Sequence, residues 1–398
     1  MAKRRKNSWV PLIVGAVGLV LAAVVGVIAY LAATAKPIHP NPAEIQSLTQ
    51  SALPQWAGAV EDGRELVRDN LTYQNLPGIS VAVGVNGDIV WAESFGWANL
   101  EEREPVMPET HFRIGTASTA LTSAAVGLLL EQGRVKLDDV IQKYVPTFPK
   151  KEFPVTLRQL MGHVSGIDTD AGDEGPLFAQ RCERPVDALR FFADLPLRFE
   201  PGAYFEYSSY GWIVVSAIVE AAAGEPLLTF MREQIFEPLS MNDTVADSST
   251  EPIADRATHY FPRFVSNPDN GLDVMRPVDY SCYSGAGVFL STASDLVRFG
   301  MAINSGTLLR PGTVELLHTP QRVRSGTETG SGLGWDIETV TLSGGPTRVV
   351  GRSGDVLGGQ TATLLTSPKH RVVVAVLSNV SYAKTYTLAV RIAEKFAK

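Results

Sequence analysis

Strand-forming sequence lies near both ends of this chain, with helical sequence between them. Residues 79–85 and 88–93 flank Asn86-Gly87, a pair that favours a type I′ hairpin because that turn needs positive φ at both positions. Strands placed so far apart in the chain predict an α+β fold in which one antiparallel sheet, built from both ends, is flanked by helices. The C-terminal strands are expected at 333–337, 347–351, 360–366 and 371–378.

Helices are predicted between and beside these strands. Residues 155–320 are expected to form a mostly helical and loop-like middle. Gly133 and Gly224 each follow an apolar helical stretch, where a left-handed C-terminal cap is favoured. The main helices are expected at about 43–70, 117–132, 211–223 and 382–396.

The N-terminal region predicts a transmembrane helix. An apolar run from Trp9 to Ala35 contains no acidic or basic residue, and about 20 apolar residues suffice to cross a bilayer core. The basic residues at positions 3–6 precede this run, which places the N-terminus in the cytoplasm. The chain is therefore expected to be a single-pass membrane protein with an extracytoplasmic main domain.

A cleaved signal peptide is the alternative for this region. The sequence Ala33-Thr34-Ala35 has the small-x-small form of a cleavage site, but the apolar run is longer than the ~7–15 residues of a typical signal core. The predicted organisation is a basic N-terminus at 1–8, an anchor at 9–35, a tether and leading helix at 36–75, and the main domain at 76–398.

Composition and charge exclude several functions. The formal net charge is −7, with basic residues scattered beyond the N-terminus, so a nucleic-acid-binding surface is not expected. The six histidines show no pair at metal-ligand spacing, and the sequence predicts no metal and no cofactor. Cys182 and Cys282 form either a disulfide or two separate buried thiols, because sequence does not show whether they are close enough to bond.

Residues 112–122 precede and open an apolar helical stretch. Their sequence, Phe-Arg-Ile-Gly-Thr-Ala-Ser-Thr-Ala-Leu-Thr, resembles the nucleophile segment of the serine β-lactamase and penicillin-binding-protein family. The family pattern is F-R-I-A-S-x-S-K-x-[LFM]-T. In that alignment Thr116 stands where the family has its serine, and Thr119 where it has its lysine.

Two further segments carry the same resemblance. Residues 205–212, Phe-Glu-Tyr-Ser-Ser-Tyr-Gly-Trp, are similar to F-x-Y-S-N-x-G-Y, so Tyr207 is kept and Ser209 replaces the asparagine. Residues 351–354, Gly-Arg-Ser-Gly, correspond to the family's Lys-Thr-Gly or His-Thr-Gly on the strand that lines the site. Supporting segments at 160–167, 284–296 and 332–335 extend the resemblance over about residues 76–398.

The resemblance implies a β-lactamase-like fold whose site lies between the sheet and a mostly helical subdomain. Thr116 would lie at its base, and the backbone N–H groups of Thr116 and Asp355 would form an oxyanion hole. Substrate would be bound by Ser209 and, on the lining strand, by Arg352, Ser353 and Gly354. The Asp355 carboxylate is unexpected there, because it offsets Arg352 and disfavours an anionic ligand.

The chemistry expected of this site is incomplete. A hydroxyl attacks an acyl carbon only if another group takes its proton. Thr119 has no titratable group near neutral pH, and Tyr207 at its usual pKa of ~10 is rarely a phenolate. Ser118 lacks a lysine three residues later, and His163 lies in a turn segment where a structural role is expected.

Three functional hypotheses follow. The loss of both serine and lysine favours a catalytically degenerate, membrane-tethered protein that binds a peptide, glycan or acyl ligand, or a protein partner, in the cleft. The second is an acyl or peptide hydrolase with Thr116 as nucleophile, Tyr207 as base and Arg352 as binding cation. The third is a structural envelope protein with a filled cleft. The plain alternatives are that Thr116 and Thr119 only cap a helix, that Tyr207 is a packed aromatic, and that Arg352 is a strand-end charge.

Overall fold

The main domain is built on one antiparallel sheet. The computed structural model describes residues 9–34, 37–169, 176–263, 271–356 and 359–397. The sheet has the strand order β1-β3-β2-β13-β12-β11-β10, and β4 adds to β3. These strands are β1 (Ser47–Ala52), β2 (Gly78–Val85), β3 (Asp88–Asn99), β4 (Glu104–Pro105), β10 (Asp336–Leu342), β11 (Gly345–Val356), β12 (Gly359–Ser367) and β13 (Val372–Ser378).

The two ends of the chain meet in the middle of this sheet, as predicted. Strand β2 pairs antiparallel with β13, with Val81 opposite Val376. Every residue of both strands is buried. Asn86 and Gly87 have φ of 55° and 97°, as the predicted type I′ hairpin between β2 and β3 requires.

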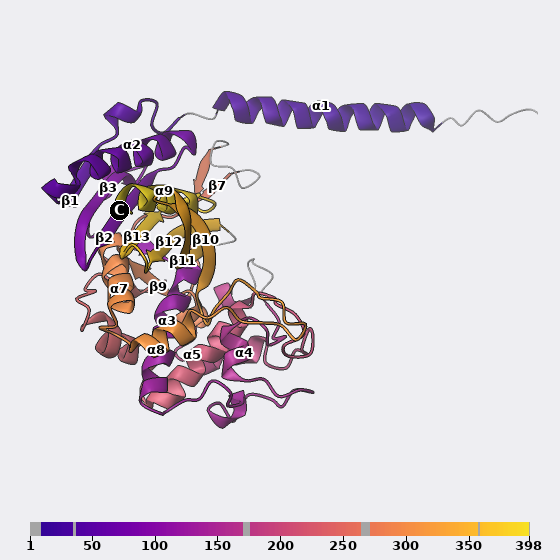
Figure 1. The fold of residues 1–398 in the computed structure, drawn as a ribbon. Helices are drawn as coiled ribbons and strands as arrows, with labels where there is room; N and C mark the ends of the chain where they lie inside the picture. The colour runs from indigo at the N-terminus through magenta and orange to yellow at the C-terminus, as the bar shows by residue number, and fades with distance from the viewer. Residues whose placement is uncertain (1–8, 35–36, 170–175, 264–270, 357–358, 398) are drawn as a thin grey trace, which may run out of the picture.

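Helices cover both faces of the sheet (Figure 1). Helices α2 (Ala57–Tyr73) and α9 (Thr385–Phe396) pack together on one face, where Trp91 stacks on Phe396 with ring centroids 6.1 Å apart. Helix α7 (Ala293–Ser305) contacts β2, β13 and β12 from the other face. Each face therefore has its own hydrophobic core.

A mostly helical subdomain extends the second core. Its helices α3 (Ser118–Glu131) and α5 (Ser209–Ala223) are buried over most of their length, so they are the apolar centre of the subdomain. The predicted left-handed caps are present, because Gly133 and Gly224 have φ of 69° and 71°. The other helices are α4 (Leu157–Met161), α6 (Leu227–Met231) and α8 (Pro311–Leu317).

Short strands link the sheet to this subdomain. They form one three-stranded sheet in the order β5-β9-β6 and one two-stranded sheet of β7 and β8. Two 3-10 helices, η3 (Gly115–Ala117) and η9 (Ser281–Ala286), adjoin the site described below. The strands are β5 (Phe112–Arg113), β6 (Val245–Ala246), β7 (Tyr260–Pro262), β8 (Leu272–Val274) and β9 (Phe289–Ser291).

Two predicted elements differ from the structure. The helix expected at 43–70 begins only at Ala57, because residues Ser47–Ala52 instead pair with β3 along the sheet edge. The strand expected at 333–337 begins at Asp336. Gly334, with φ of 93°, lies in a turn that an extended strand does not contain.

The N-terminal helix α1 (Val10–Thr34) stands apart from the domain (Figure 1). Its segment Pro11–Tyr30 has a mean hydropathy of 2.9 and buries no part against the rest of the protein. A helix of 25 residues is about 37 Å long, which exceeds the ~30 Å hydrocarbon core of a bilayer. Helix α1 is therefore long and apolar enough to span a membrane.

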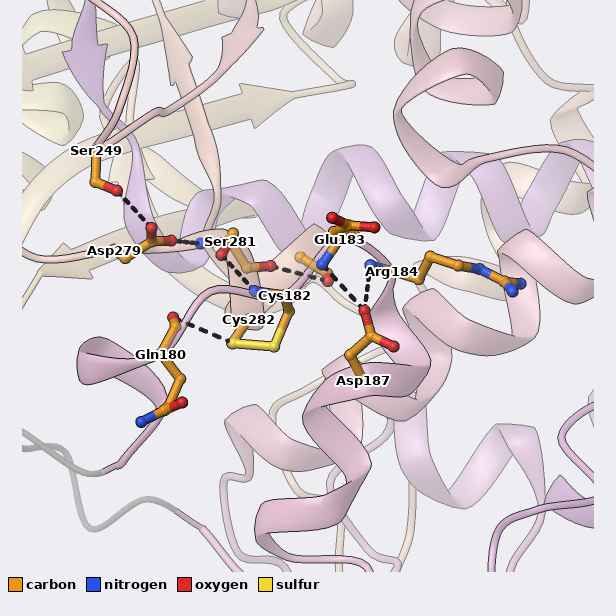
Figure 2. Close-up of a disulfide and its surroundings, with 10 residues drawn as sticks. Gln180, Cys182, Glu183, Arg184, Asp187, Ser249, Asp279, Ser281 and Cys282 are labelled. Carbon is orange, nitrogen blue, oxygen red and sulfur yellow. Dashed lines mark hydrogen bonds between the residues drawn. A yellow bond between two sulfur atoms is a disulfide. The ribbon is translucent and has the colours of Figure 1, made fainter.

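Cys182 and Cys282 form a disulfide (Figure 2). Their Cα atoms are 4.8 Å apart although the residues are 100 positions apart in sequence. The backbone N–H of Cys182 also donates to Ser281 Oγ at 3.0 Å. The bond therefore ties the loop before residues 185–191 to η9, and it settles the alternative that the sequence left open.

Candidate functional site

The predicted nucleophile position lies where the sheet meets the helical subdomain. Thr116 is in η3, between β5 and α3, and η3 packs on β11. A Cβ atom on Gly115 would lie 1.9 Å from the Asp355 carbonyl oxygen, and one on Gly354 would lie 1.6 Å from the Ile114 carbonyl oxygen. Glycine at both positions therefore allows the two backbones to meet.

This close approach brings Thr116 and Asp355 into direct contact. The Thr116 hydroxyl donates a short hydrogen bond to Asp355 Oδ1. The backbone N–H of Asp355 also points to Thr116 Oγ1, at 3.5 Å. Because a carboxylate accepts its proton, the Thr116 hydroxyl is held by a charge-assisted hydrogen bond.

Thr119 supplies no replacement for a catalytic lysine. It is fully buried, and its hydroxyl donates to the Thr116 carbonyl oxygen at 2.9 Å. The rival nucleophile Ser118 is also fully buried, and its hydroxyl has no partner among the described residues. Neither side chain therefore offers a reactive group at the protein surface.

Tyr207 lies just before α5 and joins the cluster. Its ring centroid is 4.6 Å from that of His163, and the Arg352 guanidinium lies over it at 5.5 Å. Burial raises the pKa of Tyr207 above its usual value and Asp355 adds to this, whereas Arg352 and the hydroxyls of Ser209 and Thr116 oppose it. The neutral phenol is therefore favoured, which makes Tyr207 a poor general base at neutral pH.

Arg352 is a buried cation in the middle of β11 and not a charge at a strand end. It is only 6% exposed, and its Nη1 donates to Asp336 Oδ1 at 2.7 Å. Its Nε is buried and has no partner among the described residues. Arg352 therefore keeps hydrogen-bonding capacity that the described protein does not use.

Ser209 lies with Tyr207, but Ser353 is directed elsewhere. Ser209 is the first residue of α5, and a hydrogen bond from its hydroxyl lowers the pKa of Tyr207. Ser353 Oγ instead bonds Thr363 Oγ1 at 3.0 Å, and Thr363 bonds Thr385 at the start of α9 at 2.9 Å. Successive side chains of a strand point to opposite faces, so the structure does not bring Ser353 to Thr116.

His163 holds the Tyr207 segment in place. It is 2% exposed. Its Nδ1 lies 3.2 Å from the backbone N of Ser208, and its Nε2 lies 3.3 Å from Trp212 Nε1. Burial lowers the pKa of His163 well below its usual value, and Arg352 lowers it further. A neutral ring that contacts one backbone N–H and one indole N–H fits the structural role expected from the sequence.

Two residues near this cluster were not expected from the sequence. Asp336 is the salt-bridge partner of Arg352. Tyr280 is 7% exposed, and its hydroxyl has no partner among the described residues. Burial raises the pKa of Tyr280; Arg113 opposes this, and the carboxylates of Asp247 and Asp355 add to it. The sequence offered one signal for each residue. Asp336 directly follows the 332–335 segment and Tyr280 shortly precedes the 284–296 segment, and both segments resemble the family pattern.

A separate pocket of about 420 Å³ lies beside the disulfide. Its lining includes Asp279 and Ser281, shown in Figure 2, but not Thr116, Tyr207 or Arg352. Within the described ranges, no group of three or more His, Cys, Asp or Glu side chains could hold a metal ion.

The sequence matches a known family over most of its length. The family model described as Beta-lactamase matches residues 64–395. The human "Serine beta-lactamase-like protein LACTB, mitochondrial" is 31% identical over an alignment of 348 residues, and the match covers 67% of this chain and 63% of that protein. "Penicillin-binding protein 4*" of Bacillus subtilis is 27% identical, over 78% of this chain and 70% of that protein. This chain therefore spans less than two thirds of the human relative.

Solved structures share the fold. The "octameric penicillin-binding protein homologue from Pyrococcus abyssi" has a TM-score of 0.69 at 25% identity, covering 83% of this chain and 76% of that one. "EstCE1, a hydrolase with promiscuous acyltransferase activity" has a TM-score of 0.70 at 19% identity, covering 86% of this chain and 100% of that one. With its domain match, its fold and its site segments in the same order, this chain belongs to the β-lactamase family.

Proposed function

We propose that this protein is a membrane-tethered, catalytically degenerate member of the β-lactamase family that binds a ligand in the cleft. The observation that carries the proposal is the pairing of Thr116 with Asp355 in place of a lysine-activated serine. An oxyanion that formed beside Thr116 would meet the Asp355 carboxylate. Oxyanion stabilisation is usually the largest single contribution to acyl-transfer catalysis, so a negative charge at this place opposes the reaction.

The residues around Thr116 nevertheless keep features of a binding site. Arg352 Nε and the Tyr280 hydroxyl are buried without a partner among the described residues. Buried polar groups in folded proteins are nearly always hydrogen-bonded, so a bound ligand is one way to satisfy both. Thr116 and Ser209 carry small hydroxyl side chains where a filled cleft would carry large apolar ones, which argues against a purely structural protein.

A second candidate is an acyl hydrolase that uses Thr116. The Asp355 carboxylate accepts the hydrogen of the Thr116 hydroxyl and is therefore better placed than Tyr207 to take its proton. Two features count against this candidate: the charge that Asp355 places beside the oxyanion, and the χ1 rotamer restriction and crowding by the threonine methyl group.

Intact-mass spectrometry separates the two candidates. The full chain in detergent is exposed to a β-lactam and to an activated ester, with Thr116→Ala as the control. We expect no adduct on the folded protein. An adduct that forms on the wild type and is lost in Thr116→Ala would establish Thr116 as a nucleophile and replace the first candidate with the second.

The membrane tether is proposed from α1 and the charges before it. The basic residues at positions 3–6 favour a cytoplasmic N-terminus, with the main domain on the other side. Carbonate extraction followed by N-terminal sequencing tests this. An intact N-terminus in the membrane pellet supports an anchor, whereas a soluble protein that begins after Ala35 would show a cleaved signal peptide.

A further inference from the structure

We propose that the cleft selects ligands that carry a protonated primary amine, and that Asp355 is the residue that determines this selectivity. The inference rests on the proposed binding function of the same cleft and adds the chemical class of the ligand. It begins from the charges around Thr116 and from the hydrogen-bonding groups that the described protein leaves unused.

Asp355 is the carboxylate beside Thr116 that has no salt-bridge partner among the described residues, although the buried Arg352 guanidinium attracts it electrostatically. Asp336 is bound to Arg352 at 2.7 Å. Asp247, which lines the separate pocket beside the disulfide, is bound to both Arg113 and Arg256, at 2.8 Å and 2.9 Å. Among the described residues, no Lys, Arg or His forms a salt bridge with Asp355, which is solvent-exposed. Its negative charge is therefore available to a ligand that enters from solvent.

The surroundings of Asp355 are rich in hydrogen-bond acceptors. Its Oδ1 accepts from the Thr116 hydroxyl, and no hydrogen bond within the described protein engages Oδ2. Hydroxyl oxygens of Tyr207 and Ser209 lie in the same cluster. A primary ammonium has three donors and no acceptor, so a carboxylate beside several hydroxyl oxygens is chemically suited to it.

Tyr280 is a second, independent indication of a ligand. Its hydroxyl is buried and has no partner among the described residues. Tyr280 directly precedes η9, which contacts η3, the helix that carries Thr116. A phenol can both donate and accept a hydrogen bond, so it can complete the shell of an amine or of a neighbouring polar group. An anionic group would be disfavoured in the same place, because Asp355 repels it.

Arg352 does not reverse this preference. Its guanidinium is already paired with Asp336 and lies over the Tyr207 ring. It is buried, whereas Asp355 is exposed. An incoming ligand therefore meets the carboxylate before the guanidinium, and the charge that it first encounters is negative.

The test compares a probe that carries a protonated amine with its neutral, N-acetylated form. Benzylamine and N-acetylbenzylamine are titrated against the full chain in detergent micelles at neutral pH, and binding is followed by ligand-observed NMR. We expect the wild type to bind benzylamine about tenfold more tightly than the acetylated probe, which is the effect of about 1.4 kcal/mol of differential binding.

Variants of Asp355 assign this preference to one side chain. Asp355→Asn keeps the shape of the side chain and removes its charge, so it should abolish the preference for benzylamine and leave binding of the acetylated probe unchanged. Asp355→Glu should keep the preference. Asp88→Asn, at the exposed hairpin turn between β2 and β3, changes net charge equally and should have no effect. Circular dichroism confirms that each variant is folded.

The outcomes distinguish this inference from the proposed function. If both probes bind the wild type equally, or the acetylated probe binds more tightly, amine selectivity is wrong while the binding cleft stands. If the wild type prefers benzylamine but Asp355→Asn keeps that preference, another group is responsible and the role of Asp355 is overturned. If neither probe binds the folded wild type, both this inference and small-ligand binding in the cleft are contradicted.

Discussion

The Thr119 hydroxyl donates a hydrogen bond to the carbonyl oxygen of Thr116 at 2.9 Å. This local bond between a side chain and the backbone three residues earlier satisfies a hydroxyl that is fully buried. The turn that opens α3 therefore keeps its shape without a charged residue at position 119. A threonine hydroxyl does not titrate near neutral pH, so position 119 carries no amine that could accept a proton.

Replacing both threonines should restore activity. Thr116→Ser together with Thr119→Lys is expected to raise the hydrolysis of an activated ester by about 10² or more, because general acid–base catalysis typically contributes ~10²–10⁴. Initial rates measure the gain. The control is Thr116→Ala with Thr119→Lys, which has the amine but no nucleophile. A well-folded double variant without a gain would contradict the alignment of these positions with the family's serine and lysine.

Asp355 should limit that restored activity. Adding Asp355→Asn to the Thr116→Ser, Thr119→Lys variant is expected to raise kcat by about tenfold, because it removes a negative charge beside the developing oxyanion. The kcat of the double and triple variants is compared at saturating ester. A triple variant that is slower than the double one would indicate that Asp355 accepts the proton of the nucleophile.

The contact between β11 and η3 should depend on Gly354. Gly354→Ala would place a Cβ atom 1.6 Å from the Ile114 carbonyl oxygen, so it is expected to lower the free energy of unfolding by about 3 kcal/mol or more. Gly345→Ala, on the same strand, meets nothing within 4 Å and should have little effect. Urea unfolding of both variants measures the difference, and equal stability would show that β11 moves freely away from η3.

Loss of the disulfide should destabilise the domain. Cys182 and Cys282 are 100 positions apart, and closing a loop of that length in the unfolded chain is estimated to contribute about 4–5 kcal/mol. Cys182→Ser with Cys282→Ser should therefore unfold at a clearly lower urea concentration than the oxidised wild type. The reduced wild type should resemble the double variant, and an unchanged midpoint would argue that the bond adds nothing to stability.

Stability should fall in mild acid because of His259. Burial, together with the nearby Arg113, lowers the pKa of His259 to about 3, while the unfolded side chain has a pKa of about 6.5. Below pH 6.5 the unfolded state therefore binds a proton that the native state does not. This stability is present above pH 6.5 and is lost progressively as the pH falls towards 3.

The expected loss is about 2 kcal/mol at pH 5, from about 1.36 kcal/mol per pH unit. Urea unfolding at pH 7 and pH 5 measures it, and His259→Gln should show a smaller decrease than the wild type. The same decrease in both proteins would assign the acid sensitivity to other groups, such as His318, whose pKa burial also lowers to about 3.

Short-range patterns predicted much of the architecture. The Asn86-Gly87 turn, the caps at Gly133 and Gly224 and the apolar helix α1 each depend on neighbouring residues alone, and each is present. The segment Ser47–Ala52 was predicted as helix but forms β1. Its conformation is set by pairing with β3 along the sheet edge, a contact between distant parts of the chain.

In the site, too, motifs predicted individual residues, whereas contacts between distant parts of the chain were not predictable from local sequence. Thr116, Thr119, Tyr207 and Arg352 were identified from motifs, and the resemblance also placed Asp355 beside Thr116, but the hydrogen bond between these two side chains was not expected. Asp355 lies 239 positions from Thr116, with which it shares a hydrogen bond. Ser353, expected in the site, instead joins Thr363 and Thr385, because the alternation of side chains along β11 directs it to the other face.

The sequence by itself determined the family resemblance, the threonines at positions 116 and 119 that align with the family's serine and lysine, and the apolar N-terminal helix. Only the tertiary structure decided that Cys182 bonds Cys282, that Arg352 pairs with Asp336, and that the Thr116 hydroxyl is held by Asp355. The reason is physical. Local patterns report which residues share a turn, whereas hydrogen bonds, salt bridges and disulfides form only where folding brings distant backbones within bonding distance.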